Sequence, residues 1–366
     1  MRCMPKGASL YPELDSKKIN INNVNNNSVK NCNAREGVMN KTTKREWTRG
    51  LMLATCLLAA GMAPVQGDAA AYPERPVRVV VPFAAGGPAD FVARLLGQKL
   101  SETWKQPVVI DNRGGAGGNL GTVLAAQAQG DGYTLLLTTS VFISNPSLYK
   151  KTGYDAFKDF APITLTAVSA TAVSRHPSYG AVNTMKDLVQ QSKAAPVSYA
   201  SPGIGTAGHL AAELFRNVTG ANVQQVPYKG AGPAMAGLLS GEVRLGFTAV
   251  PPVIVLSKSG KLVPIAVTSL KRLDVRPVVS SVGESYPGFE VDNMYGLLAP
   301  KATPAALVRK INADTLAALK MPDLRQRFAQ DAFEMRGNSP EEFAQYLRSE
   351  FTKWAKVIKD SGAQVD

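Results

Sequence analysis

Cysteine is absent from residues 72–366, and histidine is scarce throughout. The three cysteines are Cys3, Cys32 and Cys56, and the two histidines are His176 and His209. Residues 72–366 therefore cannot form a disulfide, use a thiol nucleophile or build a cysteine-ligated metal site. With only two histidines, a histidine-ligated metal site is not expected either. We expect no metal and no cofactor.

Runs of Lys and Arg are missing as well. The chain has 41 Lys and Arg against 28 Asp and Glu, but 10 and 5 of these fall in the first 71 residues, which leaves residues 72–366 with a net charge of +8. These charges are scattered singly, so nucleic-acid binding is not expected. A mildly basic surface suits the collection of anionic solutes.

The first 71 residues read as a segment that is not part of the fold. Residues 1–38 are rich in asparagine, so we expect them to be disordered or to follow a misassigned start, with Met1 and Met39 both open as the true one. Residues 39–71 combine a basic stretch, an apolar run of about 15 residues and Ala-Ala-Ala, the pattern of a signal peptide cleaved near Ala71. A lipoprotein at Cys56 and a membrane anchor are alternatives, although a span needs about 20 apolar residues.

After residue 72, predicted strands and helices alternate. Strand-like "RVVVPF", "PVVIDN" and "YTLLLTTS" are separated by helical patterns at 88–103 and 118–129, which predicts a parallel sheet with helices on both faces. The alternation starts again from about Arg175, and the chain ends in helical patterns at 303–319, 321–332 and 339–361. The fold class is therefore α/β, with two lobes and a ligand cleft between them. We expect Ser339 and Glu342 to cap the last helix and Gly362 to end it.

Two glycine loops, one in each lobe, lead from a strand into a helix. In "PFAAGGPAD", Gly86 and Gly87 let a ligand approach the backbone, and Asp90 would cap the helix or hold a water against a ligand. In "YASPGIGTAGHLAAELF", the loop holds Ser201 and Gly203, and Thr206 is the expected N-cap. Both loops present N–H groups at a helix start, which predicts a cradle for carboxylates with nothing placed to break a bond.

Enzyme interpretations find weaker support. A dehydrogenase would need an acid after the strand that follows the Gly115-x-Gly117 turn, and none stands there. A secreted serine hydrolase would need Ser147 near Lys258, but Pro146 favours a turn at Ser147. We favour a backbone-bonded role over a catalytic one for His209, and both a solvated and a carboxylate-pairing role stay open for Lys229. No catalytic residue is expected.

An ordered set of motifs resembles a known family. The motifs are "YPERPVRVVVPFAAGGPADFVARLLGQKL", "PVVIDNRGGAGGNLG", "DGYTLLL", "NPSLY", "GTAGHLAAELF", "VPYKGAGPA" and "GFE…YGLLAP". They are similar to the Bug family, the extracytoplasmic receptors of tripartite tricarboxylate transporters. The resemblance implies a periplasmic type II binding-protein fold whose chain crosses between lobes near 170–175 and 292–297. Lobe one would then be 72–174 plus 295–366, and lobe two 175–294.

The resemblance also implies a ligand site. Its implied residues are Phe83, Ala85, Gly86, Gly87, Asp90, Thr138 and Ser140 in lobe one, and Ser201, Gly203, Thr206, His209, Tyr228, Lys229 and Thr248 in lobe two. Phe83 and Phe142 would pack on the ligand or fill the core. The sequence departs from the family at Met294, where Trp is frequent, and at Gly237 and Arg244, where an acidic residue is common.

The function implied is capture of a small carboxylate in the periplasm. The lobes would close on the solute and the closed form would dock on membrane permease subunits. A ligand-sensing module that serves a membrane sensor kinase is the alternative, and the serine hydrolase a more distant one. We expect a monomer that binds no nucleic acid, and the sequence leaves the identity of the carboxylate open.

Overall fold

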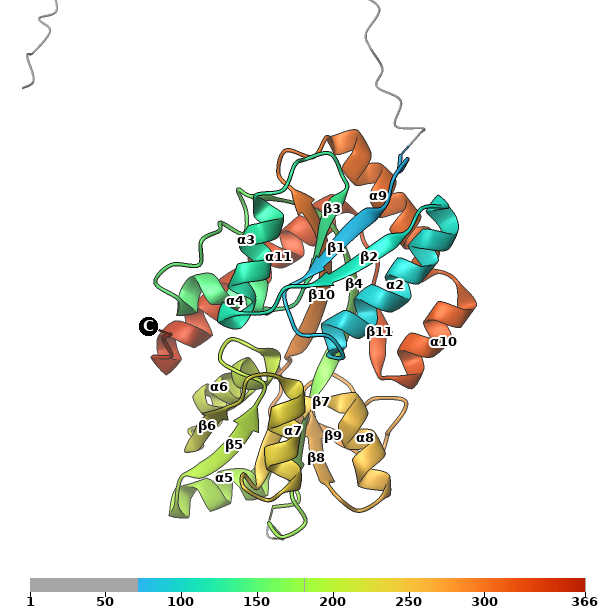
Figure 1. Ribbon diagram of the computed structural model, residues 1–366. Coiled ribbons are helices and arrows are strands. Elements are labelled where there is room, and N and C mark those ends of the chain that lie inside the picture. Colours follow the sequence, from blue (N-terminus) through green and yellow to red (C-terminus); the bar gives the residue numbers. More distant parts are fainter. Residues whose placement is uncertain (1–71, 181, 366) are drawn as a thin grey trace, which may run out of the picture. The chain divides into compact units, whose positions relative to one another are not determined.

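In a computed structural model, residues 72–180 and 182–365 are described (Figure 1). The predictions for residues 1–38, for the signal peptide 39–71 and for the three cysteines lie outside the described residues. Within the described ranges no helix is long and apolar enough to cross a membrane. The same ranges hold no cluster of three His, Cys, Asp or Glu side chains that could bind a metal ion.

Eleven strands and a set of helices alternate along the described chain. The strands are β1 (Val77–Val81), β2 (Val108–Asn112), β3 (Thr134–Thr138), β4 (Phe160–Arg175), β5 (Val197–Ser201), β6 (Val223–Pro227), β7 (Leu245–Ala249), β8 (Val263–Val267), β9 (Ser280–Ser281), β10 (Asp292–Pro300) and β11 (Phe333–Met335). The α-helices are α2 (Pro88–Trp104), α3 (Asn119–Ala126), α4 (Val141–Leu148), α5 (Met185–Ala194), α6 (Ala207–Thr219), α7 (Ala231–Leu239), α8 (Val250–Lys258), α9 (Ala305–Leu319), α10 (Pro322–Gln330) and α11 (Pro340–Ser361). Short 3₁₀ turns lie at η2 (Ala116–Gly118) and η3 (Val282–Glu284).

The strands form two α/β lobes that share one long strand. In the first lobe β2, β1 and β3 are parallel, and β10 lies antiparallel between β3 and β4. In the second lobe β6, β5 and β7 are parallel, and β4 runs antiparallel to β7. Strand β4 changes its pairing partner along its length. It pairs with β10 up to Ala170 and with β7 from Thr171. The predicted two-lobe α/β fold is confirmed.

Two helices that the sequence did not predict both contain proline. The prediction of a turn at Ser147 is wrong, because Ser147 lies in α4 despite Pro146. Proline has no N–H to bond the carbonyl four residues back, and the Tyr154 hydroxyl donates to that carbonyl, on Phe142, at 2.9 Å. In α8 the prolines occupy the first turn, where N–H groups have no intrahelical partner in any case.

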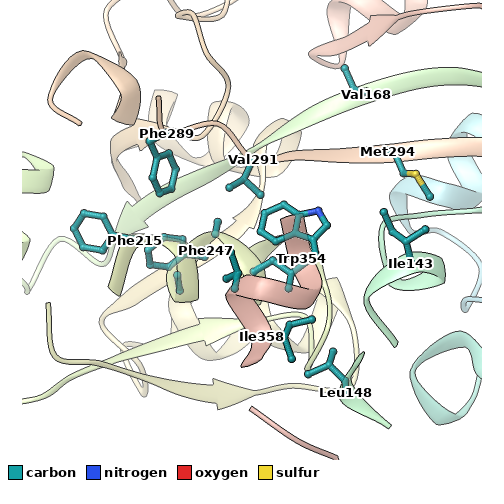
Figure 2. Close-up of a cluster of buried hydrophobic side chains, with 14 of the residues drawn as sticks. Ile143, Leu148, Val168, Phe215, Phe247, Phe289, Val291, Met294, Trp354 and Ile358 are labelled. Carbon is teal, nitrogen blue, oxygen red and sulfur yellow. The ribbon is translucent and has the colours of Figure 1, made fainter. Parts of the chain in front are cut away.

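A single apolar cluster reaches from one lobe into the other (Figure 2). It includes Ile143 and Leu148 from α4, Phe215 from α6, Phe247 from β7 and Trp354 from α11. Helix α11 packs against α4, α6 and β4, so the C-terminal helix contacts elements of both lobes. Its ends match the prediction: Ser339 and Glu342 form a capping box, and Gly362 has left-handed dihedral angles at the C-cap. A second cluster, which includes Trp104, lies in the first lobe alone.

Candidate functional site

The first predicted loop is held by Asp90 from within its own helix. Gly86 has φ +82°, and its N–H donates to Asp90 Oδ2 at 2.9 Å. Arg94 Nε donates to the same oxygen at 2.9 Å. Burial acts to raise the pKa of the Asp90 carboxyl, but the hydrogen bonds from Arg94 and Gly86 outweigh it and lower this pKa. Asp90 thus holds the residue before the N-cap and makes no bond to the N-cap itself, and its predicted role toward a ligand stays a prediction.

The loop still presents backbone to solvent. Ala85 and Gly86 are exposed, and within the described chain neither Ala84 nor Ala85 donates its N–H to another residue. Gly87 occupies the N-cap of α2 with no side-chain cap bond. Two amides that lie beside a helix N-terminus are thus available to an anion.

The second loop repeats this arrangement with a different acceptor. Gly205 has φ +80°, and its N–H donates to His209 Nδ1 at 3.2 Å, again a side chain four residues further along the chain. His209 is buried, and burial together with the nearby Arg216 lowers its pKa to about 4. The neutral ring therefore accepts at Nδ1 and carries its proton on Nε2, 3.8 Å from Glu213 Oε1. The predicted backbone-bonded role of His209 is confirmed.

Other residues of the second loop bond within the loop and to β6 and its end. Thr206 occupies the N-cap of α6, as predicted, but its side chain makes no cap bond. Its hydroxyl donates instead to Gly203 O at 2.7 Å, because Gly203 at φ +141° turns that carbonyl toward it. Ser201 Oγ accepts from Gln225 Nε2 at 2.6 Å, and Ser201 O accepts from the N–H of Tyr228 at 3.0 Å. The loop is thus tied to β6 and its end.

Two threonines at strand ends keep unpaired hydroxyls. Thr138, at the end of β3, and Thr248, on β7, are buried, and within the described chain neither Oγ1 has a hydrogen-bond partner. Thr138 lies opposite Gly296 of β10, and Thr248 lies opposite Ala172 of β4. A buried polar atom without a partner gains a hydrogen bond when a polar ligand reaches it.

The Ser140 side chain is hydrogen-bonded to strand β10. Its hydroxyl accepts from the N–H of Met294 at 3.1 Å and contacts Asp292 O at 3.4 Å. Met294 is fully buried at this point of β10. Ser140 therefore links the end of β3 to the beginning of β10.

The remaining predicted residues differ in exposure. Lys229 is exposed and makes no ion pair among the residues described. The Tyr228 hydroxyl lies against the Cα of Gly237 in α7, where a β-carbon would overlap it. Phe142 is fully buried and stacks on Tyr154 with centroids 5.6 Å apart, so it fills the core. Phe83 is partly buried and packs against the first-lobe cluster.

Sequence reasoning missed two neighbouring polar side chains of α4, one of which bonds to the second lobe and one within the first. Ser144 Oγ, from α4, donates to Gly205 O at 2.9 Å, in a fully buried bond between residues 61 positions apart. Asn145, next to it, donates from Nδ2 to Gly117 O at 3.0 Å and to Asn119 Oδ1 at 2.7 Å. Asn145 begins the motif "NPSLY", but Ser144 lies just outside it.

A separate cavity of about 450 Å³ lies against β4 and β10, and no residue of either loop lines it. It is lined from β4, β10, β11 and α11 by charged side chains that include Asp292, Glu334 and Arg336. Burial and the neighbouring Glu290 raise the pKa of Asp292 to about 6, although Arg336 and Lys353 act against this. No sequence motif pointed to this cavity.

The hydrolase interpretation gains no support from the geometry. Ser147 lies on α4, which packs against α11, whereas Lys258 ends α8, which packs against β4 and β8 (Figure 1). Helices α4 and α8 lie well apart in the figure. The structure does not bring this serine and this lysine together.

Comparison with known proteins agrees with the geometry. A family model described as "Tripartite tricarboxylate transporter family receptor" matches residues 92–363. The protein BugT of Bordetella pertussis is 33% identical over 86% of this chain and 97% of its own length.

Two solved structures of similar proteins have carboxylates in their names. The R. palustris protein Rpa4515 with adipate is 33% identical, with a TM-score of 0.76, over 80% of this chain and all of that one. MatC from Rhodopseudomonas palustris with bound malate is 29% identical, with a TM-score of 0.71, over 78% of this chain and all of that one. The chain therefore belongs to the tripartite tricarboxylate transporter receptor family, also known through its Bug proteins, and is a periplasmic solute-binding receptor.

Proposed function

We propose that this receptor captures a small carboxylate between its lobes and delivers it to the membrane subunits of a tripartite transporter. The observation that carries the proposal is the matched pair of loops, each with a glycine amide fixed by a side chain four residues later. Such loops hold backbone donors in place before a ligand arrives, so little conformational freedom is lost on binding.

The donors expected to meet the solute come from both lobes. In lobe one they are the free amides of Ala84 and Ala85 and the Thr138 hydroxyl. In lobe two they are the Thr248 hydroxyl and the residues of the loop 201–206. Adipate and malate, the compounds named with two similar proteins, each carry two carboxylates. A dicarboxylate with one end in each lobe is therefore our first candidate.

The remaining parts of the proposal concern delivery. The proposed lobes are 72–174 plus 295–366 and 175–294, and we propose that the closed form of the two lobes is the one that docks on the permease subunits. A solute that binds the closed form more tightly shifts the population toward it. Export would remove a signal peptide ending near Ala71.

The test is a thermal-shift screen of protein purified from the periplasm and refolded to remove bound solute. The panel contains adipate, malate, citrate, glutamate and benzoate, with the corresponding diamines and alcohols as uncharged or cationic controls. A bound solute adds RT ln(1 + [L]/Kd) to stability, so one at 100 times its Kd adds about 2.7 kcal/mol. Recovery of the compound unchanged would separate a receptor from an enzyme. No shift with any carboxylate would refute the proposal.

A further inference from the structure

The Gly205 peptide is held from two directions. Its N–H donates to His209 of its own lobe, and its carbonyl accepts from Ser144 of α4 in the first lobe. Ser144 is fully buried. A β-carbon on Gly205 would lie 2.9 Å from Asn145 Oδ1 and from Leu148 Cδ1, so the loop is in close contact with α4. The second ligand loop thus takes part of its support from the opposite lobe.

The helix that follows this loop is attached to the first lobe at its other end too. Arg216 Nη2 donates to Ser361 O at 2.8 Å, and Asn217 Nδ2 to Val357 O at 3.4 Å, both on α11. Helix α6 is therefore bound by α4 at its N-terminal end and by α11 at its C-terminal end. A movement between lobes that shifts α6 must change the Gly205–Ser144 contact.

We propose that Ser144 is a positioning residue of the solute site. It holds the Gly205 carbonyl from the opposite lobe and so fixes the loop 201–206 in the conformation that receives the solute. This inference rests on the proposed function, since the loop is one half of the proposed site. Two glycines in the loop have positive φ, Gly203 and Gly205, and the loop has many other conformations once the contact is lost. Without the Ser144 hydroxyl, the loop 201–206 is ordered only when the solute binds. The conformational entropy lost in that step lowers the affinity for the solute.

The experiment compares Ser144→Ala with Ser147→Ala. Both serines lie on α4, but Ser147 is only half-buried and its side chain makes no hydrogen bond within the described residues. With the carboxylate that stabilises the wild type, calorimetric titration should show about tenfold weaker binding for Ser144→Ala, the loss expected for one buried hydrogen bond. Ser147→Ala should bind as the wild type does.

Amide hydrogen exchange supplies a readout that needs no solute. In ligand-free Ser144→Ala, exchange within residues 201–206 should be faster than in the wild type, while exchange in α2 and β1 stays the same. Ser144→Cys, nearly equal in size to serine but with a weak S–H donor, guards against a variant that fails to fold. It should fall between wild type and Ser144→Ala in both measurements.

The two proposals fail in different ways. If Ser144→Ala binds the solute with wild-type affinity, or if its loop exchanges as slowly as in the wild type, Ser144 is not a positioning residue. If the wild type itself binds no carboxylate, the proposed function fails. Faster exchange in Ser144→Ala would then still show that Ser144 orders this loop, so the two results stay distinct.

Discussion

At the scale of single residues, the two loops share a geometry but not a chemistry. The acceptor in the first lobe is Asp90, a buried carboxylate paired with Arg94, and the acceptor in the second lobe is His209, a neutral imidazole. An ionised acceptor makes the stronger hydrogen bond to an amide. A neutral acceptor adds no negative charge beside an incoming carboxylate. We expect the loop of the first lobe to be the more rigid of the two.

Asp90→Ala should weaken solute binding at least tenfold. The substitution removes the acceptor that fixes the Gly86 amide and leaves Arg94 without its ion pair. Titration calorimetry with the solute found in the screen measures the change. Asp187→Ala is the matched control, because Asp187 also accepts backbone N–H groups at a helix start, in α5. It should lower stability and leave affinity alone. Unchanged affinity in Asp90→Ala would remove Asp90 from the site.

Asp292 should make stability depend on pH in a defined direction. Its pKa is raised to about 6 in the folded protein, so between about pH 4 and pH 6 the folded state binds more protons than the unfolded state. The free energy of unfolding therefore falls as pH rises through this window. The substitution Asp292→Asn should abolish this decrease in the free energy of unfolding. At pH 7.5 the variant should be more stable than the wild type by on the order of 2 kcal/mol.

Urea unfolding at pH 4.5 and pH 7.5 measures this difference. Glu341→Gln, which alters an exposed carboxyl at the start of α11, is the control and should follow the wild type at both values. Equal pH dependence in Asp292→Asn and wild type would mean that Asp292 ionises freely in the cavity.

At the scale of elements, Gly237 matters for how α7 packs on the segment that follows β6. A β-carbon at Gly237 would overlap the Tyr228 hydroxyl, so Gly237→Ala should destabilise the protein by about 2 kcal/mol. In a Tyr228→Ala background the same change should cost nothing, since the overlap is gone and alanine favours helix over glycine. Thermal unfolding of the four proteins measures the coupling. An equal cost in both backgrounds would show that Tyr228 is not the obstacle.

The sequence predicted those elements whose pattern is local. The helical patterns in 88–103 and 339–361 indicated α2 and α11 within a residue of their observed ends. The glycine loops were found because a strand, glycines and a helix start lie together in the chain. The long strand β4 was not predicted, although threonines and serines alternate with apolar residues along it, and both sets of side chains are buried.

Features that depend on the placement of the lobes could not be predicted. The Ser144–Gly205 bond joins positions 61 residues apart, and nothing near Ser144 in sequence marks it as a partner of the second loop. The cavity around Asp292 draws its walls from four elements spread over residues 165–353. Such sites form only through the sheet register and the packing of α11. The proposed lobe boundaries and the solute contacts themselves stay predictions.

At the scale of the whole molecule, the apolar cluster ties the lobes together. Trp354 on α11 is fully buried in it, together with Ile143 of the first lobe and Phe247 of the second (Figure 2). Its ring N–H donates to Glu350 at 2.8 Å, which fixes the indole on its own helix. Movement between lobes is therefore expected to keep the packing of α11 against α4 and α6 intact.

This shared cluster predicts that the lobes unfold together. Proteins with two lobes often unfold in separate steps, but here calorimetry should show one transition whose calorimetric and van't Hoff enthalpies agree. Trp354→Ala should cost about 3–5 kcal/mol and split the transition in two, because the cavity it leaves lies where the lobes meet.

Trp104→Ala is the matched control. Trp104 is also a buried tryptophan with a hydrogen-bonded ring N–H, but its cluster lies in the first lobe alone. This variant should lower the transition temperature without splitting the transition. Two transitions in the wild type would mean that the lobes unfold independently. A single transition in Trp354→Ala would mean that the shared strand β4, rather than the packing around α11, couples the lobes.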